Sequence, residues 1–340
     1  MLLLGKKSVA VLVMVVTNIL VSMTPVGATV FKIATLSPDG TSWMQRMRAG
    51  AAEIEKKTNG QVTFKFFPGG IMGNDQSVLR KIRIGQLHGG ALTDGGLKRI
   101  YPESQVYALP FTFRTFEEVD YVRERLDGEI VAGLEKAGFV SFGLAEGGFA
   151  YLMSGKPLKS IEDVKGQKVW IPEGDKLART VFETGGVSPI PLPLADVMTG
   201  LQTGLIDTVV TSPIGAVALQ WHTRVKYMTD LPLTYFYALL AIDKKAFQKL
   251  SREHQAVVRE VMTGIYKEIN KQNRMDNANA TKALIKQGIT MVTVSSEEKQ
   301  RWEQNADKAR QELRAQGLYK GGIFDKLSGL IGSYRKATAQ

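Results

Sequence analysis

Hydrophobic and polar positions change their spacing from segment to segment along the chain, which predicts alternating strands and helices. Residues 29–36 and 61–67 alternate apolar and polar side chains and are rich in β-branched and aromatic residues, as strands are. Between them, from Ser42 to about Asn59, the apolar residues recur at helical spacing. A strand, a helix and a second strand in this order are typical of the start of a parallel α/β sheet.

The same alternation continues through most of the chain and predicts two α/β lobes. We expect further strands at 89–92, 139–144, 168–171, 187–192 and 207–210, and helices at 78–87, 117–136, 176–184 and 195–203. We place a chain crossing near residues 147–152. The first lobe is expected to comprise 29–149 and about 235–275, and the second 150–234 and about 276–340, including the C-terminal helices.

The longest helical pattern runs from Ser251 to about Gly288. At a rise of 1.5 Å per residue, about 35 helical residues span roughly 50 Å. Because this exceeds the width of one small lobe, we expect the helix to bridge both lobes. Two terminal helices are predicted at 297–316 and 324–336.

The first 28 residues have the pattern of a secretory signal peptide. Lys6 and Lys7 precede an apolar run over about 9–23, and small residues lead to a cleavage site after Ala28. The apolar run is shorter than the roughly 20 residues that a membrane-spanning helix needs. We therefore expect an exported protein, soluble in the periplasm once the peptide is removed.

Composition excludes several kinds of chemistry. The 340 residues contain no cysteine, which excludes disulfides, thiolate metal sites and cysteine nucleophiles. The three histidines lie far apart at no metal-binding spacing, so we expect neither a metal site nor catalytic residues. The glycine-rich turn at 69–73 matches neither a dinucleotide-binding nor a phosphate-binding loop, and no cofactor is expected.

The net charge of +11 raises the possibility of an anionic partner such as nucleic acid. Within residues 271–340, however, acidic residues are interspersed with the basic ones along helices. Mixed signs are typical of solvated helix faces rather than of a stripe that follows phosphates. We therefore expect no nucleic-acid partner.

Five segments, in order, resemble the solute-binding proteins of tripartite ATP-independent periplasmic (TRAP) transporters, the dicarboxylate-binding-protein-like family. They are FPGGIMGND at 67–75, LRKIRIGQL at 79–87, LPFTF at 109–113, DVKGQKV at 163–169 and LQTGLID at 201–207. The resemblance implies a periplasmic-binding-protein fold of α/β class: two lobes, a hinge and a long bridging helix. It also implies one small ligand in the cleft, delivery to a membrane permease driven by an ion gradient, and no enzymatic activity.

Departures from the family pattern fall at its ligand positions. Trp170 stands where the family normally carries an arginine that pairs with the substrate's carboxylate, chemistry that suits a planar guanidinium. Ala150 stands where a second arginine often follows, and Thr211 where an asparagine is common. Asp94 matches an acidic position of some members, and Leu194 matches a large residue over the ligand. We expect that the ligand is not a dicarboxylate held by the usual arginine.

Aromatic faces and acceptors remain as candidate ligand contacts. Trp43, Trp170 and Tyr235 offer flat faces, and Asp94, Glu146, Glu173 and Asp175 offer acceptors. This set suits an organic ligand such as a sugar or polyol, an aromatic compound or an amine, besides organic acids. The complete set of expected ligand-binding residues is Ser37, Trp43, Asp94, Phe149, Ala150, Trp170, Glu173, Leu194, Thr211 and Tyr235.

Five of the candidate residues also have a structural interpretation. Trp43 and Trp170 could be core residues, and Asp94 could be a turn residue. Glu173 and Asp175 could lie in an exposed loop or cap a helix. Arg99 or Arg114 could replace the missing arginine. A binding protein that serves a sensor kinase is an alternative function, as is an exported enzyme, for which the sequence offers no catalytic pair.

Overall fold

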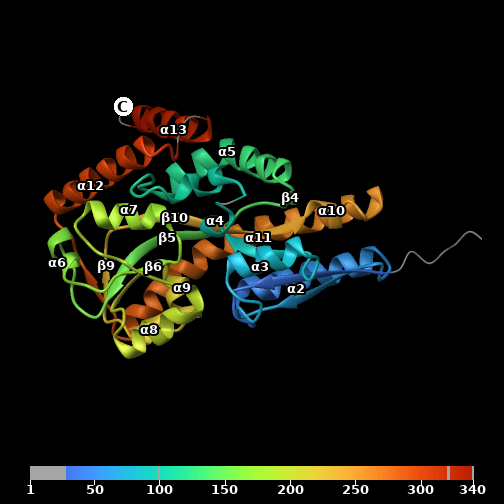
Figure 1. Cartoon of the computed structure of the whole chain (residues 1–340), viewed down its shortest axis with the longest axis horizontal. Coiled ribbons are helices and arrows are strands. Elements are labelled where there is room, and N and C mark those ends of the chain that lie inside the picture. The colour runs from blue at the N-terminus through green and yellow to red at the C-terminus, as the bar shows by residue number, and fades with distance from the viewer. Residues whose placement is uncertain (1–27, 99, 320–321, 339–340) are drawn as a thin grey trace, which may run out of the picture.

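The first part of the chain folds in the predicted α/β order (Figure 1). The computed structural model describes residues 28–98, 100–319 and 322–338, so the predicted signal peptide lies outside the described residues except for Ala28. Strand β1 lies between β2 and β3 and is parallel to both, as the sequence pattern predicted. The elements here are β1 (Thr29–Thr35), α2 (Ser42–Lys57), β2 (Val62–Phe67), α3 (Asp75–Arg83), β3 (Gly89–Thr93), α4 (Asp94–Leu97), η1 (Pro102–Ala108) and α5 (Phe116–Lys136).

Polar side chains fix where the helices of this part begin. The Asn74 Oδ1 atom accepts a hydrogen bond from Ser77 N at 3.0 Å, and Thr93 Oγ1 accepts one from Gly96 N at 3.0 Å. The Asn74 cap starts α3 three residues before the predicted helix at 78–87. This earlier start matters because it places Asn74 and Asp75 at the first turn of α3, the end that faces the second lobe.

Two long antiparallel strands, β5 (Ala145–Ser154) and β10 (Thr234–Asp243), join the lobes. Among the described residues, the sheet order is β11-β9-β5-β10-β3-β1-β2, with β4 on β10 and β8 on β5. The predicted strand at 139–144 is only β4 (Phe139–Val140), and the expected chain crossing is itself the middle of β5. Gly148 adopts a φ of 91°, and a Cβ there would lie 2.9 Å from the Asn277 amide nitrogen.

The second lobe is built on the far half of β5. Strand β8 and strand β9 both pair with β5 in antiparallel fashion, and β6 and β7 form a separate parallel pair. The predicted helix at 176–184 is observed with the same limits. The elements are α6 (Ile161–Lys165), β6 (Trp170–Pro172), α7 (Lys176–Thr184), β7 (Ile190–Leu192), η2 (Leu194–Asp196), α8 (Val197–Thr203), β8 (Thr208–Thr211), α9 (Pro213–Ala218), η3 (Trp221–Thr223), β9 (Tyr227–Thr229) and β11 (Thr290–Val292).

Helix α11 (Arg252–Lys286) bridges the two lobes, as its predicted length required. It packs on α2 in the first lobe and on α9 and β5 in the second. Short helix α10 (Lys244–Phe247) precedes it. Buried apolar residues recur along α11 at helical spacing, from Val258 to Leu284, and pack in the cores of both lobes.

The two C-terminal helices pack on different partners. Helix α12 (Ser296–Ala315) packs on α7 and α6, whereas α13 (Gly322–Thr338) packs on α5 and η1 (Figure 1). The packing of α13 therefore departs from the expectation that all C-terminal helices belong to the second lobe. No helix in the described ranges combines the length and the apolar character that a membrane span requires.

Candidate functional site

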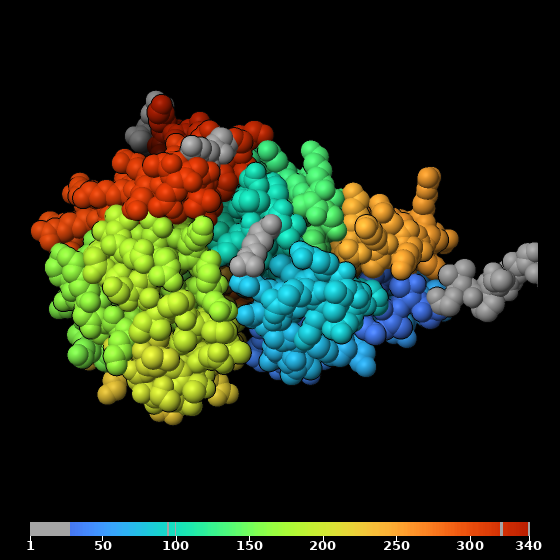
Figure 2. Space-filling model, viewed as in Figure 1, coloured from blue at the N-terminus to red at the C-terminus, as the bar shows by residue number. Residues whose placement is uncertain are grey.

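A cavity of about 390 Å³ lies where the two lobes meet. Figure 2 shows the yellow-green residues of the second lobe meeting the cyan residues of the first along a seam, with the red C-terminal helices above. Most of the cavity surface is apolar, as is usual for sites that enclose small molecules. Its lining comes from α3, β3 and α4 on one side, from β6, α7 and α9 on the other, and from α12 at one end.

Trp170 lines this cavity, and its ring is held from two sides. Its Nε1 atom donates to Leu192 O at 3.0 Å, which ties β6 to its partner strand β7. Its ring meets Trp221 edge to face, with centroids 5.2 Å apart. Because the side chain is only 5% exposed, Trp170 belongs both to the core of the second lobe and to the cavity wall.

Asp75 lines the cavity from the first lobe, although the sequence analysis did not select it. Its Oδ2 atom accepts from Thr93 Oγ1 at 2.8 Å and from Thr93 N at 3.3 Å. Its Oδ1 atom is shielded from solvent and has no hydrogen-bond partner among the described residues. Burial raises the pKa of the Asp75 carboxyl, and the bonds from Thr93 offset part of the rise. In the sequence, the feature that could have identified Asp75 is the Asn74-Asp75 pair directly after the glycine-rich turn.

Two contacts join the lobes across the cavity mouth. Asn74 Nδ2 donates to Glu173 Oε2 at 3.4 Å, and Lys98 Nζ donates to the carbonyl oxygen of Gly174. The molecule is thus in a closed arrangement. The charged lining consists of Asp75, Lys98, Glu173 and Asp175, and no arginine lines the cavity within the described ranges. Arg114 instead pairs with Glu303 at 3.4 Å, and Arg99 lies outside the described residues.

Five of the expected ligand-binding residues line the cavity, and Asp175 joins them. Those five are Ala150, Trp170, Glu173, Leu194 and Thr211. Asp175 also caps α7, because its Oδ1 atom accepts from Ala178 N at 3.2 Å, which confirms the cap interpretation of that residue. Asp94 begins α4, and its side chain lies outside the described part of the structure.

Four expected residues are absent from the described lining, for reasons set by local geometry. Successive side chains of a strand point to opposite faces. Ala150, Thr234 and Phe236 line the cavity, so their neighbours Phe149 and Tyr235 face the first lobe's core. Trp43 packs against the core between α2 and α11. The Ser37 hydroxyl bonds the Thr41 hydroxyl at 2.8 Å within the turn that precedes α2.

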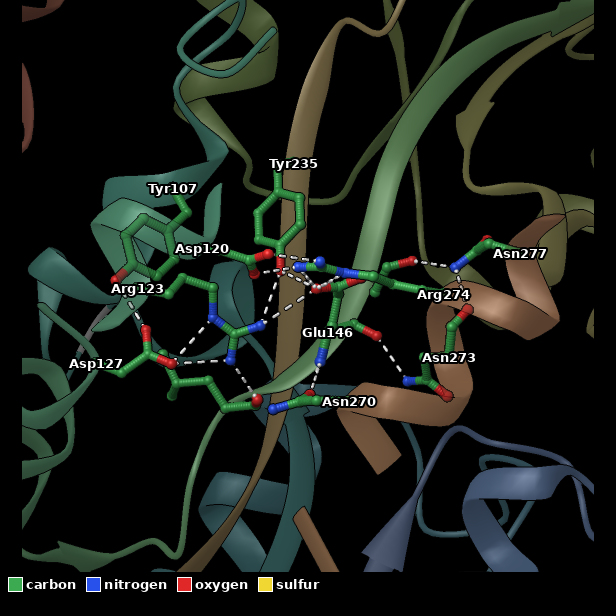
Figure 3. A network of polar contacts seen from close by, with 12 residues as sticks. Tyr107, Asp120, Arg123, Asp127, Glu146, Tyr235, Asn270, Asn273, Arg274 and Asn277 are labelled. Atoms are coloured by element: carbon green, nitrogen blue, oxygen red, sulfur yellow. Dashed lines mark hydrogen bonds and ion pairs between the residues drawn. The ribbon is translucent and has the colours of Figure 1, made fainter. Parts of the chain in front are cut away.

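Glu146, expected as a ligand acceptor, instead lies in a polar network at the crossing between the lobes (Figure 3). Its carboxylate accepts from Arg274 Nε and Nη2, each at 2.9 Å, and from the Tyr235 hydroxyl at 3.1 Å. Arg123 Nη1 lies 3.6 Å from the same carboxylate and donates to the Tyr235 hydroxyl at 2.9 Å. Burial raises the pKa of Tyr235, so its hydroxyl stays protonated and can donate.

Backbone contacts extend this network along α11. Asn270 Oδ1 accepts from Glu146 N at 2.7 Å, and Asn273 Nδ2 donates to Glu146 O at 2.6 Å. Asn277 Nδ2 donates to Gly147 O at 3.2 Å (Figure 3). The bridging helix is thus bonded to β5 at the point where that strand passes between the lobes. Sequence reasoning missed this network because its residues on α11 lie between 124 and 130 positions from their partners Glu146 and Gly147 on β5.

Comparison with known proteins decides the family. Residues 33–316 match the DctP family, described as bacterial extracellular solute-binding protein, family 7. The chain belongs to this family of solute-binding proteins. Membership agrees with the expected TRAP resemblance and with a binding protein rather than an enzyme. No group of three or more acidic, histidine or cysteine side chains in the described residues could hold a metal ion.

Curated relatives of this family-7 chain are distant. An uncharacterized protein YiiZ of Salmonella typhimurium is 26% identical over 61% of the chain, and the match spans 64% of that relative. The 2,3-diketo-L-gulonate-binding periplasmic protein YiaO of Escherichia coli K12 is 27% identical over 59% of the chain and 62% of its own length. The matches thus span less than two thirds of these relatives.

The fold of this family-7 chain is that of solved TRAP periplasmic solute-binding proteins. The structure from Xanthobacter autotrophicus Py2, with bound β-D-galacturonate, superposes with a TM-score of 0.82. It covers 89% of this chain and 99% of its own, at 20% identity. Together with the packing described above, this likeness establishes the two-lobe fold.

Proposed function

We propose that this chain captures a small organic ligand between its two lobes and delivers it to the membrane permease of a TRAP transporter. The observation that carries the proposal is the cavity between lobes that are joined by two strands and one long helix. Ligand that touches both lobes stabilises the closed arrangement, which is the form that a permease can recognise. We also propose the expected division of the lobes, except that α13 goes with the first lobe, because it packs on α5 and η1.

We further propose that the ligand is not a dicarboxylate held by an arginine. No described lining residue is an arginine, and the lining carboxyls outnumber the single described lysine. That lysine, Lys98, already donates to Gly174 O, so a carboxylate placed here would lose its hydration with little compensation. Flat apolar walls with acceptors suit a neutral or cationic ligand, such as a polyol, an aromatic compound or an amine. The relative named for diketogulonate and the solved structure with galacturonate make sugar acids the principal competing class.

The contact residues follow from the same arrangement. We propose that Ala150, Trp170, Glu173, Leu194 and Thr211 contact the ligand, together with Asp75.

The chain acts in the periplasm after cleavage behind Ala28. Sequencing the N-terminus of protein recovered from that compartment should return Thr29 as the first residue, and an uncleaved Met1 would contradict the export step.

A thermal-shift screen tests capture, because a ligand that binds only the folded state raises the unfolding temperature. The panel should contain succinate, galacturonate, a polyol, an aromatic acid and an arylalkyl amine. We expect stabilisation by a neutral or cationic member and none by succinate. Uptake into vesicles that contain the permease then tests delivery. If a ligand binds but uptake does not depend on the chain, delivery is refuted and a sensor-kinase partner is favoured.

A further inference from the structure

The cavity continues beyond the family's ligand positions to the C-terminal helix α12. At this end its wall is formed by side chains from α7, from α12 and from the loop before α5, namely Phe111, Val181, Phe182, Trp302 and Ala306. The rings of Phe111 and Trp302 lie 6.4 Å apart at an angle of 44°. We call these five residues the α12 compartment.

Phe111 is held firmly in this compartment. Its φ of 55° lies in the left-handed region, which is costly for a residue with a Cβ. Its N–H donates to Leu233 O at 2.8 Å, which fixes this backbone against β10. Because the ring position is fixed by the surrounding chain, the compartment presents a preformed apolar wall.

Trp302 carries an unsatisfied polar atom in the same wall. Its side chain is 6% exposed, and its Nε1 atom is shielded from solvent with no hydrogen-bond partner among the described residues. By contrast, the Trp170 indole in the same cavity donates to Leu192 O. A buried indole N–H normally finds an acceptor, and the residues that the structure describes supply none to Trp302.

A complementary unsatisfied atom lies among the lining residues of the first lobe. Within the described ranges, the Oδ1 atom of Asp75 on α3 is an acceptor with no donor, and Trp302 Nε1 on α12 is a donor with no acceptor. Helices α3 and α12 stand apart in the molecule, and α12 lies beside α7 (Figure 1). Neither atom has appreciable surface open to the cavity in this closed form. A partner can therefore reach them only while the lobes are open, and it must be accommodated by a shift of the neighbouring side chains when they close.

We propose that the α12 compartment holds a flat apolar group of the ligand, with an oxygen acceptor for Trp302 Nε1, while a hydroxyl or ammonium group of the same ligand bonds Asp75. This inference rests on the proposed capture function and names the ligand class: an aromatic ring with an acceptor at one end and a donor at the other. Trp302 is then a specificity-determining residue outside the family's arginine positions.

Titration calorimetry with two amines tests the role of Trp302. We choose 4-methoxyphenethylamine, whose ether oxygen can accept a bond, and phenethylamine, which lacks that oxygen. We expect the first to bind roughly two- to tenfold more tightly, the range of one net hydrogen bond. The variant Trp302→Phe should abolish that preference, whereas Trp43→Phe, which alters a tryptophan away from the cavity, should retain it.

Stability without ligand provides an independent reading. Both Trp302→Phe and Trp170→Phe remove buried ring volume, but only Trp170→Phe also loses a hydrogen bond that the described residues show, the one to Leu192, so Trp170→Phe should unfold at the lower temperature of the two. Equal binding of the two amines, binding of neither, or a preference that survives Trp302→Phe would each overturn the inference. The capture function itself fails only if succinate, galacturonate and the rest of the panel also fail to bind.

Discussion

Glu146 on β5 and Arg274 on α11 face each other in a bidentate ion pair. Arg274 Nε lies 2.9 Å from Oε1, and Nη2 lies 2.9 Å from Oε2. The Glu146 side chain is 1% exposed, whereas that of Arg274 is 31% exposed and also contacts Asp120. This pair joins the bridging helix to one of the two strands that run through both lobes.

Replacing Glu146 by glutamine should destabilise the protein strongly. The substitution keeps the shape but leaves the buried Arg123 with less compensating charge, and loss of one partner of a buried pair costs roughly 3–5 kcal/mol. Because Arg274 is partly exposed, we expect a loss nearer about 3 kcal/mol in the free energy of unfolding, measured with urea. Glu124→Gln removes a 76% exposed partner of Arg125 and should cost less than about 1 kcal/mol. Equal losses would contradict the assignment.

Asp75 should make stability depend on pH. Its pKa in the folded protein is raised above the ordinary value of 3.8 by burial, so the folded state holds the proton to higher pH than the unfolded chain. The free energy of unfolding should therefore fall as the pH rises from below 3.8 through the raised pKa. Melting curves between pH 3 and 7 should show that Asp75→Asn removes part of this fall. The exposed Asp39→Asn control should leave it intact.

Gly96 should tolerate no side chain, because a Cβ there would lie 2.1 Å from Asp75 Oδ2. Gly96→Ala must displace the Asp75 carboxylate from Thr93, and overpacking of this kind costs roughly 1–3 kcal/mol. The matched control is Gly95→Ala, whose Cβ would lie no closer than 3.5 Å to any neighbouring atom. Chemical denaturation should separate the two variants. Equal stabilities would show that Asp75 is not held in this position.

The contact between Asn74 and Glu173 should favour the closed form. These side chains come from different lobes and meet at 3.4 Å. Because the Asn74 side chain also caps α3, Asn74→Ala should lower the unfolding free energy by about 0.5–2 kcal/mol, while shifting empty protein toward the open form. Small-angle scattering should then report a larger radius of gyration. Glu183→Ala, on the outer part of the second lobe, should cause no expansion.

The sequence predicted the elements whose apolar residues repeat regularly. The limits of α7 and the extent of α11 followed directly from helical spacing. Strand β10 was not predicted, because residues 238–242 form a continuous apolar run that shows no alternation. Alternate residues of this run pack in two different cores, Leu239 and Ala241 in one and Leu240 and Ile242 in the other, which explains why neither face of the strand is polar.

The candidate site was predicted less well than the fold, for two physical reasons. Alignment with a family motif identified Ala150 and Trp170. It did not show which residues of a strand point into the cavity, so Phe149 and Tyr235 were also selected, although they face the core of the first lobe. Glu146 was selected for its carboxylate, whereas its partner Arg274 lies 128 positions away. No local pattern reports such a pairing, which only the packing of α11 on β5 brings about.

Helices α12 and α13 follow one another in the chain yet pack on different lobes, one against α7 and the other against α5. Helix α12 also contacts the first lobe, through Arg310 and the carbonyl oxygen of Pro110, and it is joined to α13 by the ion pair of Arg314 and Asp325. If α12 moves with α7 when the lobes rotate, these contacts change and so does the angle between α12 and α13. A pair of fluorescent probes on these helices, separated by a short stretch of sequence, would then report the motion of whole lobes. The distance between labels on α12 and α13 should therefore report the opening of the cleft, with no label placed in the cavity.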